Sequence, residues 1–357
     1  MRRRLALRAV STALGAVAAL VLVEALLRVF HLAPTDGVAT VTEAEFRSVP
    51  GLLAPGQDLV DWRLHALPHR VHTNSLGYRG REFAPTKAAG EIRILMVGDS
   101  FTYGEFVNDE ETLPARLEHE LGRWCAGVRV INAGIGGTTI DTHARMVERA
   151  LPLRLDLVIE TFSENDLEDL ADTSAWDVFA SNRNLKSHFP LAIVFPALRR
   201  LALWNFALDA RARLRALIAA DGLDPTSEAA RSRRRAVRVR LLPAYTEALI
   251  ALRDRLRVQE VGFVLALFPS HLSLRKGGST EQLEWLTRVG GDAGIATVNL
   301  LGPMRESGQP LERLYLLPHD GHPSADGYAV AARFLADALR RGEGLKKSCA
   351  QDGGARR

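Results

Sequence analysis

The sequence predicts an α/β protein with a parallel sheet covered by helices on both faces, preceded by an N-terminal hydrophobic helix. Two observations predict the sheet: short apolar runs alternate with helical segments of ten or more residues, and the runs end at glycine or polar residues. Strands that alternate with such helices form βαβ units, in which the strands are parallel. A single long apolar stretch near the amino terminus predicts the additional helix.

Composition limits the classes of function. Of the 357 residues, 47% are apolar and 25% are charged, which is ordinary globular usage and excludes a disordered or fibrous chain. The net charge of +4 is small, so no nucleic-acid partner is expected. Two cysteines are too few for a disulfide-stapled domain, and no Cys/His cluster has the spacing of a zinc site. We therefore expect neither a metal nor a cofactor.

Residues 1–31 are predicted to form a cytoplasmic tip and a transmembrane anchor. The stretch Ala9–Leu27 rises about 28 Å as a helix, close to the thickness of a bilayer core. Four arginines precede it: Arg2, Arg3, Arg4 and Arg8. A cleaved signal peptide is the competing interpretation, but no convincing cleavage site follows. The positive-inside rule then predicts a single-pass protein of the inner (cytoplasmic) membrane, with its C-terminal domain on the periplasmic or extracellular side.

Glu24 is costly inside a bilayer, but near the outer interface it can pair with Arg28 one turn on. Residues 32–90 are rich in Pro, Gly and Thr and show little periodicity. We expect them to form a tether that ends in an ordered approach segment at residues 72–80.

The remaining elements follow from periodicity. Apolar runs predict strands at Ile92–Val97, Val128–Ile131, Leu155–Thr161, Gly262–Phe268 and Ala296–Leu301. Apolar positions at helical spacing, such as Leu113, Leu117 and Leu121, predict helices at Thr112–Trp124, Thr139–Leu151, Leu241–Gln259, Thr280–Gly290 and Ala325–Arg341. Together these elements define a domain over residues 91–345, followed by a flexible tail over residues 346–357.

An insertion interrupts the pattern at residues 169–240 and is helical in parts. Within it, residues 231–240 contain six arginines, which form either a solvated helix face or a patch facing anionic headgroups or an acidic glycan. Cys125 and Cys349 lie in an expected oxidising compartment, and whether they pair is left open.

Four loops at the predicted carboxyl edge of the sheet carry the chemistry. The loop after the first strand holds Gly98-Asp99-Ser100, and the loop after the second holds Gly134-Ile-Gly-Gly137. Ser163-Glu-Asn165-Asp166 follows the third strand, and His319-Asp320-Gly-His322 precedes the last helix. Ligands of parallel sheets bind at this edge, so the four loops predict one shared site.

This set of residues is complete for acyl transfer. Ser100 needs a base in order to act as a nucleophile, His322 can take its proton, and Asp320 can orient the imidazole. Three donors are available for the oxyanion of the tetrahedral intermediate: the backbone N–H of Ser100, the backbone N–H of Gly137 and the side-chain amide of Asn165. Asp99 is expected to stabilise the turn rather than to react, and His143 is expected to be a surface or packing residue.

The four loops resemble the motif blocks of the SGNH hydrolase superfamily, also called GDSL esterases and lipases. The resemblance implies a flavodoxin-like three-layer αβα fold with Ser100 as nucleophile and His322 as base. It also implies oxyanion donors at Gly137, five residues after Asn132, and at Asn165. The N-terminal layout, with Asn74-Ser-Leu-Gly-Tyr-Arg79 before the first strand, resembles membrane-anchored bacterial members.

Two positions depart from the family pattern. Ser163 replaces the glycine of the third block, and the last block reads Asp-Gly-His instead of Asp-x-x-His, so His319 occupies the usual position of the acid. We assign the acid to Asp320, because a neutral imidazole cannot replace a carboxylate.

The resulting expectation is a membrane-anchored serine esterase that hydrolyses an acyl or acetyl ester of a lipid or glycan. An O-acetyltransferase that acts on a cell-envelope or exported glycan would use the same triad and is the alternative. A catalytically silent glycan-binding module is a third interpretation, against which the intact set of catalytic residues argues. The acyl group, the alcohol and the oligomeric state are not predicted.

Overall fold

The computed structural model describes residues 2–30, 32–33, 37–61, 67–170, 183–184, 188, 190–219 and 228–342. Its main sheet has five parallel strands: β3 (Ile92–Gly98), β4 (Val128–Asn132), β5 (Leu157–Phe162), β6 (Gly262–Leu267) and β7 (Ala296–Asn299). Their order is β4-β3-β5-β6-β7. This is the flavodoxin-like order, so the predicted fold class is confirmed.

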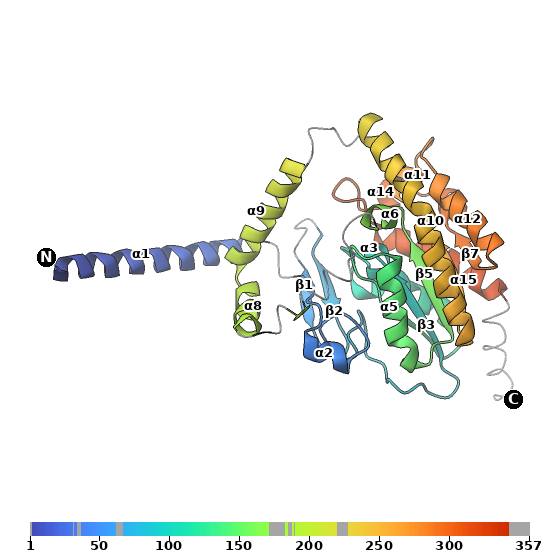
Figure 1. The fold of residues 1–357 in the computed structure, drawn as a ribbon, viewed down its shortest axis with the longest axis horizontal. Coiled ribbons are helices and arrows are strands. Elements are labelled where there is room, and N and C mark those ends of the chain that lie inside the picture. The colour runs from blue at the N-terminus through green and yellow to red at the C-terminus, as the bar shows by residue number, and fades with distance from the viewer. Residues whose placement is uncertain are drawn as a thin grey trace.

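Helices cover both faces of the sheet (Figure 1). On one face α4 packs against α15 and β4, and on the other α10 packs against α5, α12 and β6. The bounds of these helices are α4 (Leu113–Gly122), α5 (Ile140–Ala150), α10 (Glu228–Val258), α12 (Glu281–Asp292) and α15 (Ala325–Arg341). The shorter helical elements are α3 (Ser100–Tyr103), η1 (Asp109–Glu111), η2 (Leu151–Leu153), α6 (Asp166–Asp169), α11 (His271–Leu274), α13 (Leu301–Glu306) and α14 (Leu311–Leu314).

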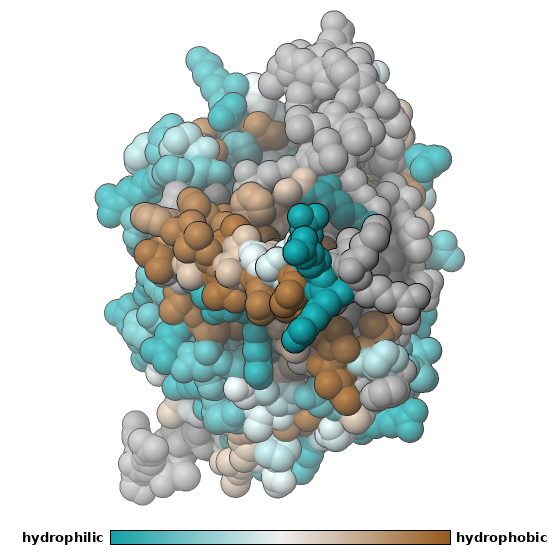
Figure 2. All heavy atoms as spheres, turned by 90° about the vertical axis from the view of Figure 1, so that its left-hand side faces the viewer, coloured by the Kyte–Doolittle hydropathy of each residue, from teal (hydrophilic) through white to brown (hydrophobic). Residues whose placement is uncertain are grey.

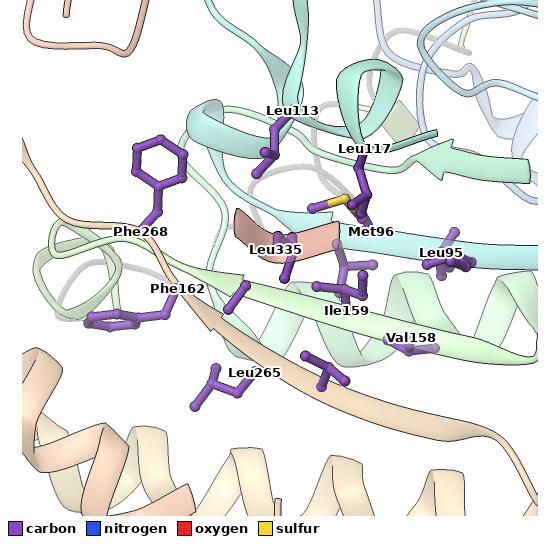
Figure 3. Packing of buried hydrophobic residues seen from close by; sticks show 14 of the residues in the cluster. Leu95, Met96, Leu113, Leu117, Val158, Ile159, Phe162, Leu265, Phe268 and Leu335 are labelled. Atoms are coloured by element: carbon purple, nitrogen blue, oxygen red, sulfur yellow. The ribbon is translucent and has the colours of Figure 1, made fainter. Parts of the chain in front are cut away.

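The core lies between the sheet and its helices because the central strands carry apolar side chains on both faces, with Arg93, Glu160 and Thr161 as buried polar exceptions. Every residue of β3 and of β5 is buried, as expected for inner strands of a parallel sheet. Figure 3 shows Met96 of β3 beneath Leu113 and Leu117 of α4. This packing fixes the ends of β3 and β5, where two of the four predicted loops begin.

Residues 32–90 contain more structure than their composition predicts. They hold α2 (Glu43–Ser48) and an antiparallel pair of strands, β1 (Asp58–Asp61) and β2 (His69–His72). The segment is fixed to the domain by arginines: the Arg149 guanidinium donates to the carbonyls of Phe46, Val49 and Pro50. The described part of this segment is therefore packed against the domain. Residues 72–80 are held by hydrogen bonds from Leu76 N and Tyr78 N to Asn74 Oδ1, as expected for an ordered approach segment.

The N-terminal helix α1 (Arg2–Val29) projects away from the domain (Figure 1). Its segment Val10–Val29 is long and apolar enough to cross a membrane, and 6% of the residues in its most apolar window are buried. A membrane anchor and a signal sequence both have this property. The predicted pair of Glu24 and Arg28 is present, with the guanidinium Nε 2.7 Å from the carboxylate.

The described part of the insertion is helical, in α8 (Leu191–Arg199), α9 (Ala202–Ala219) and the first turns of α10. Helix α10 begins at Glu228 rather than at the predicted Leu241, so the arginine-rich stretch lies in its amino-terminal half, where Arg235 and Arg240 are exposed. Pro243 lies inside the helix. The predicted tail at residues 346–357, including Cys349, lies outside the described residues.

Candidate active site

The strand β3 delivers Ser100 to the carboxyl edge of the sheet. Gly98 ends the strand, where a Cβ would lie 2.2 Å from Thr102 Oγ1, so only glycine fits. Asp99 then caps α3, and its side chain accepts a hydrogen bond from the Phe101 N–H at 2.9 Å. Ser100 is the first residue of this short helix and is half-buried, so its hydroxyl is held in a tight turn but remains accessible.

The His319–His322 loop brings an imidazole and a carboxylate to Ser100. His322 Nε2 lies 2.8 Å from Ser100 Oγ, and His322 Nδ1 makes a short contact with Asp320 Oδ1. The backbone N–H of His322 also donates to the same Asp320 oxygen at 2.8 Å. The side chains of His322 and Asp320 are 23% and 28% exposed, so a substrate can reach the three residues. They form the chain of contacts that nucleophilic catalysis by serine requires.

The structure places His322, and not His319, beside Ser100. His319 is exposed, and among the described residues its one hydrogen bond runs from its backbone N–H to the carbonyl of Leu316. The His322 ring contacts two phenylalanine rings, with centroid distances of 5.3 Å to Phe101 and 5.6 Å to Phe106. The loop therefore presents the Asp320–His322 pair despite its shortened spacing.

The environment of His322 changes its protonation equilibrium. Burial alone would lower the pKa of His322, but the hydrogen bond and negative charge of Asp320 raise it above the ordinary 6.5. Burial would likewise raise the pKa of Asp320, whereas its hydrogen bonds to His322 lower it overall. Asp320 thus stays ionised and stabilises the imidazolium.

A general base must be neutral to accept a proton, so kcat/KM should rise as His322 loses its proton. The pKa of His322 is raised, so the midpoint of the pH profile should lie at a pH higher than about 6.5, the ordinary pKa of a free histidine. Asp320→Asn should move the midpoint to lower pH. The measurement is a profile of kcat/KM against pH for both proteins, and a wild-type midpoint below 6.5 would contradict the geometry.

The loop after β4 lies against the turn that holds Ser100. An added Cβ on Gly134 would lie 2.1 Å from Tyr103 N, so the close approach of these backbones requires glycine. An added Cβ on Gly136 would lie 3.6 Å from Ser100 Cβ. The N–H of Gly137 is attached to the carbonyl carbon of Gly136, and Gly137 itself has a φ of +71°. The predicted donor at Gly137 therefore belongs to a peptide unit next to the nucleophile.

Asp99 links the third loop to the nucleophile. Its Oδ2 accepts hydrogen bonds from Ser163 Oγ and Asn165 Nδ2, both at 2.7 Å, and lies 3.5 Å from Ser100 Oγ. Asn165 and Ser100 thus contact the same carboxylate oxygen, which orients the Asn165 amide. The serine that replaces the family glycine at position 163 forms part of this arrangement, and the structural role expected for Asp99 agrees with its complete burial.

Arg79, in the segment before the first strand, has a role that its sequence pattern does not predict. The Arg79 side chain is completely buried and pairs with Asp109 at 2.7 Å. Its guanidinium also donates to the carbonyls of Tyr103, Gly104 and Val107. It thereby fixes the loop that carries Phe106, which contacts His322 from a left-handed backbone with a φ of +63°. The local sequence does not distinguish a buried arginine of this kind from an exposed one.

A groove of about 950 Å³ lies elsewhere, between residues 72–83, α4 and β4, and Ser100, Asp320 and His322 are not among its lining residues. Within the described residues, no three His, Cys, Asp or Glu side chains are grouped so as to hold a metal ion.

Glu164 accepts hydrogen bonds from the Ser270 N–H and the Ser273 hydroxyl, which fixes the loop after β5 to the loop after β6.

Comparison with known proteins gives a matching family. Residues 96–330, more than half of the chain, match the GDSL-like lipase/acylhydrolase family. A solved putative lipolytic G-D-S-L protein from Desulfitobacterium hafniense is 15% identical and covers 70% of this chain and 100% of its own, with a TM-score of 0.43. An acetylxylan esterase mutant from Geobacillus stearothermophilus is 16% identical and covers 71% and 96%, with a TM-score of 0.41. No curated protein matches the chain.

A serine, a histidine and a carboxylate in contact at the carboxyl edge of a parallel α/β sheet form the arrangement found in hydrolases that use a serine nucleophile. Within that class, the chain belongs to the GDSL-like lipase/acylhydrolase family. The resemblance predicted from the four loops is therefore confirmed.

Proposed function

We propose that this protein is a membrane-anchored esterase in which Ser100, His322 and Asp320 cleave an acyl or acetyl ester of a lipid or glycan outside the cytoplasmic membrane. The observation that carries the proposal is the continuous contact from Ser100 Oγ through the imidazole to Asp320. The proposed units are the anchor at residues 1–31, the segment at 32–90, the catalytic domain at 91–345 with its insertion at 169–240, and the tail at 346–357.

The reaction follows from the geometry. Ser100 Oγ attacks the ester carbonyl while its proton moves to His322 Nε2, and the imidazolium is stabilised by Asp320. The carbonyl oxygen becomes an oxyanion that the N–H groups of Ser100 and Gly137 and the amide of Asn165 stabilise. His322 then donates its proton to the leaving alcohol. Water, activated by the same imidazole, releases the acid from the acyl-enzyme.

An assay of the full chain in detergent tests this function. Short-chain aryl esters and acetylated glycans are supplied with and without a sugar acceptor, and Ser100→Ala serves as the control. We expect release of free acid that depends on Ser100 and is unchanged by the acceptor. Transfer of the acyl group to the sugar at the expense of hydrolysis would favour an O-acetyltransferase, and absence of turnover on every ester would contradict both activities.

The membrane topology makes a separate prediction. A reporter that is active only after export should be active when fused to the carboxyl terminus, and the unprocessed chain should remain in the membrane fraction. The reason is that the arginines before Val10 favour the cytoplasm, whereas the apolar helix stays in the bilayer. The matched control is the same reporter fused after Arg8, which should be inactive. A mature protein that starts after residue 28 would show a cleaved signal instead.

A further inference from the structure

The insertion is attached to the carboxyl-terminal end of α1. The Glu24 carboxylate accepts hydrogen bonds from the first amides of α9, Ala202 N at 2.9 Å and Leu203 N at 2.8 Å. Arg28 pairs with Glu24 and donates to the carbonyl of Arg200 at the end of α8. Each charge thus faces the helix end that it stabilises, an anion at the amino terminus of α9 and a cation at the carboxyl terminus of α8.

These contacts hold the turn between α8 and α9 beside the last two turns of α1. The span ends at Val29, and Glu24 lies about 7.5 Å before it at 1.5 Å per residue. Figure 1 shows α8 and α9 lying across the end of α1 rather than continuing its direction. A bilayer crossed by α1 therefore has its outer boundary at the level of this turn.

Apolar side chains are exposed on α8, on α9 and on the turn between them. The exposed fractions are 67% for Ile193, 42% for Val194, 41% for Leu201, 44% for Phe206 and 42% for Leu208. Figure 2, which faces the side from which α1 projects, shows apolar residues gathered there. Nearby Arg200 and Arg211 are exposed. Apolar residues accompanied by basic ones are typical of helices that lie in a membrane interface.

We propose that α8, the Leu201 turn and the start of α9 lie in the outer interface of the membrane that α1 crosses, with their exposed apolar side chains at the boundary of headgroups and acyl chains. The inference rests on the proposed anchor. A lipid surface is favoured over a protein partner because the turn is bonded to the last turns of the span itself. The two helices would then hold the catalytic domain at a fixed height above the bilayer.

Depth-dependent quenching in the full chain tests this arrangement. A polarity-sensitive fluorophore is attached at Ile193→Cys, with Leu20→Cys as the positive control inside α1 and Val258→Cys as the negative control at the far end of α10. Native cysteines are replaced by alanine, and the unlabelled background must retain ester turnover. The protein is reconstituted in phosphatidylcholine–phosphatidylglycerol vesicles that carry spin labels at shallow or deep acyl positions.

We expect the Leu20 probe to be quenched most by deep labels, the Ile193 probe most by shallow labels, and the Val258 probe by neither. If Leu20 is quenched while Ile193 behaves like Val258, the interfacial docking is wrong and the anchor stands. If the Ile193 probe is shielded from both lipid labels and aqueous iodide, a protein partner covers it and the proposal is overturned. If Leu20 is unquenched, the anchor fails and the inference fails with it.

A second, independent observation concerns His143, which the sequence analysis expected to be a surface or packing residue. It is completely buried, with Nδ1 2.8 Å from Glu160 Oε1 and Nε2 3.0 Å from Thr138 Oγ1. The Thr138 hydroxyl has one proton, which it donates to the carbonyl of Ile135 at 2.6 Å. Nε2 must therefore carry a proton and donate to Thr138.

This chain of hydrogen bonds reaches the oxyanion loop. Thr138 follows Gly137 directly, and its bond to Ile135 closes the turn that holds Gly136 and Gly137. We infer that His143 is a positioning residue, which locks the Thr138 hydroxyl and so aligns the Gly137 N–H. Burial would lower the pKa of His143, but the Glu160 carboxylate raises it overall, which agrees with a donating Nε2.

A double-mutant cycle on kcat tests this role. We expect Thr138→Val and His143→Ala each to lower kcat by roughly 10-fold or more, since a misaligned oxyanion donor loses part of its usual effect, with little change in KM. The double variant should be no worse than the worse single variant. Thr138→Ser should keep the wild-type kcat, and His143→Gln, whose amide can still donate, should recover part of it. A wild-type kcat in folded Thr138→Val would overturn the inference.

Discussion

Replacing Ser100 with alanine should lower ester turnover by roughly 10⁴-fold or more, because no other group in the site can form the acyl-enzyme. The residual rate would come from substrate binding and the oxyanion donors alone. Labelling by a serine-directed phosphonate should disappear as well. The fold should be unaffected, since the Ser100 hydroxyl contacts His322 and Asp99, both in the site itself.

The matched control is Ser307→Ala at the end of α13, where the lost hydroxyl donates to the carbonyl of Met304 and accepts from the N–H of Gln309, both away from the site. This variant should keep wild-type turnover and labelling. Thermal unfolding of both variants separates loss of chemistry from loss of structure. If Ser100→Ala retains more than a few per cent of the activity, the serine mechanism is wrong.

Much of the sheet follows from the sequence because its inner strands are buried on both faces. An apolar run such as Ile92–Val97 has few other stable placements, and β3 occupies it with one further residue. The third strand begins two residues later than predicted. The reason is Asp156, whose carboxylate accepts hydrogen bonds from Lys87 Nζ and Arg93 N, so this residue forms the turn into the strand.

The segment at residues 32–90 could not be predicted in the same way. Its strands have four residues each, which is too short for a periodic signal. Two of its glycines, Gly51 and Gly77, permit close packing rather than flexibility: an added Cβ on Gly51 would lie 2.1 Å from the carbonyl oxygen of Gly77. Composition alone does not distinguish a glycine in a tight backbone contact from one in a linker.

Some residues in and around the candidate site were predictable from local sequence patterns, and others were not. Ser100, Asp320 and His322 were predicted because their loops carry recognisable patterns, and the structure places the three in contact. Arg79 and His143 were assigned no part in the site, because their surroundings are set by partners distant in sequence. His143 meets Glu160 only once α5 packs beside β5, and a lone histidine on a helix gives no sign of this.

His322→Ala should lower turnover about as much as Ser100→Ala, whereas His319→Ala should cost far less. The reason is geometric: His322 Nε2 is 2.8 Å from Ser100 Oγ, while His319 is exposed and bonds through its backbone N–H to Leu316. Without the imidazole the serine loses its general base, and the nearby Asp99 carboxylate, which already accepts hydrogen bonds from Ser163 and Asn165, is a far weaker base. Parallel measurements of kcat/KM for the two alanine variants decide between the histidines.

Asp320→Asn completes this prediction. An amide can neither hold the imidazole in the tautomer that accepts from Ser100 nor stabilise the imidazolium, so we expect a loss of roughly 10²-fold or more. The loss should be smaller than that of His322→Ala, because Phe101 and Phe106 still restrict the ring. A His319→Ala variant that is more damaging than His322→Ala would mean that the loop changes its register when substrate binds, and Asp320 would then lose its assigned role.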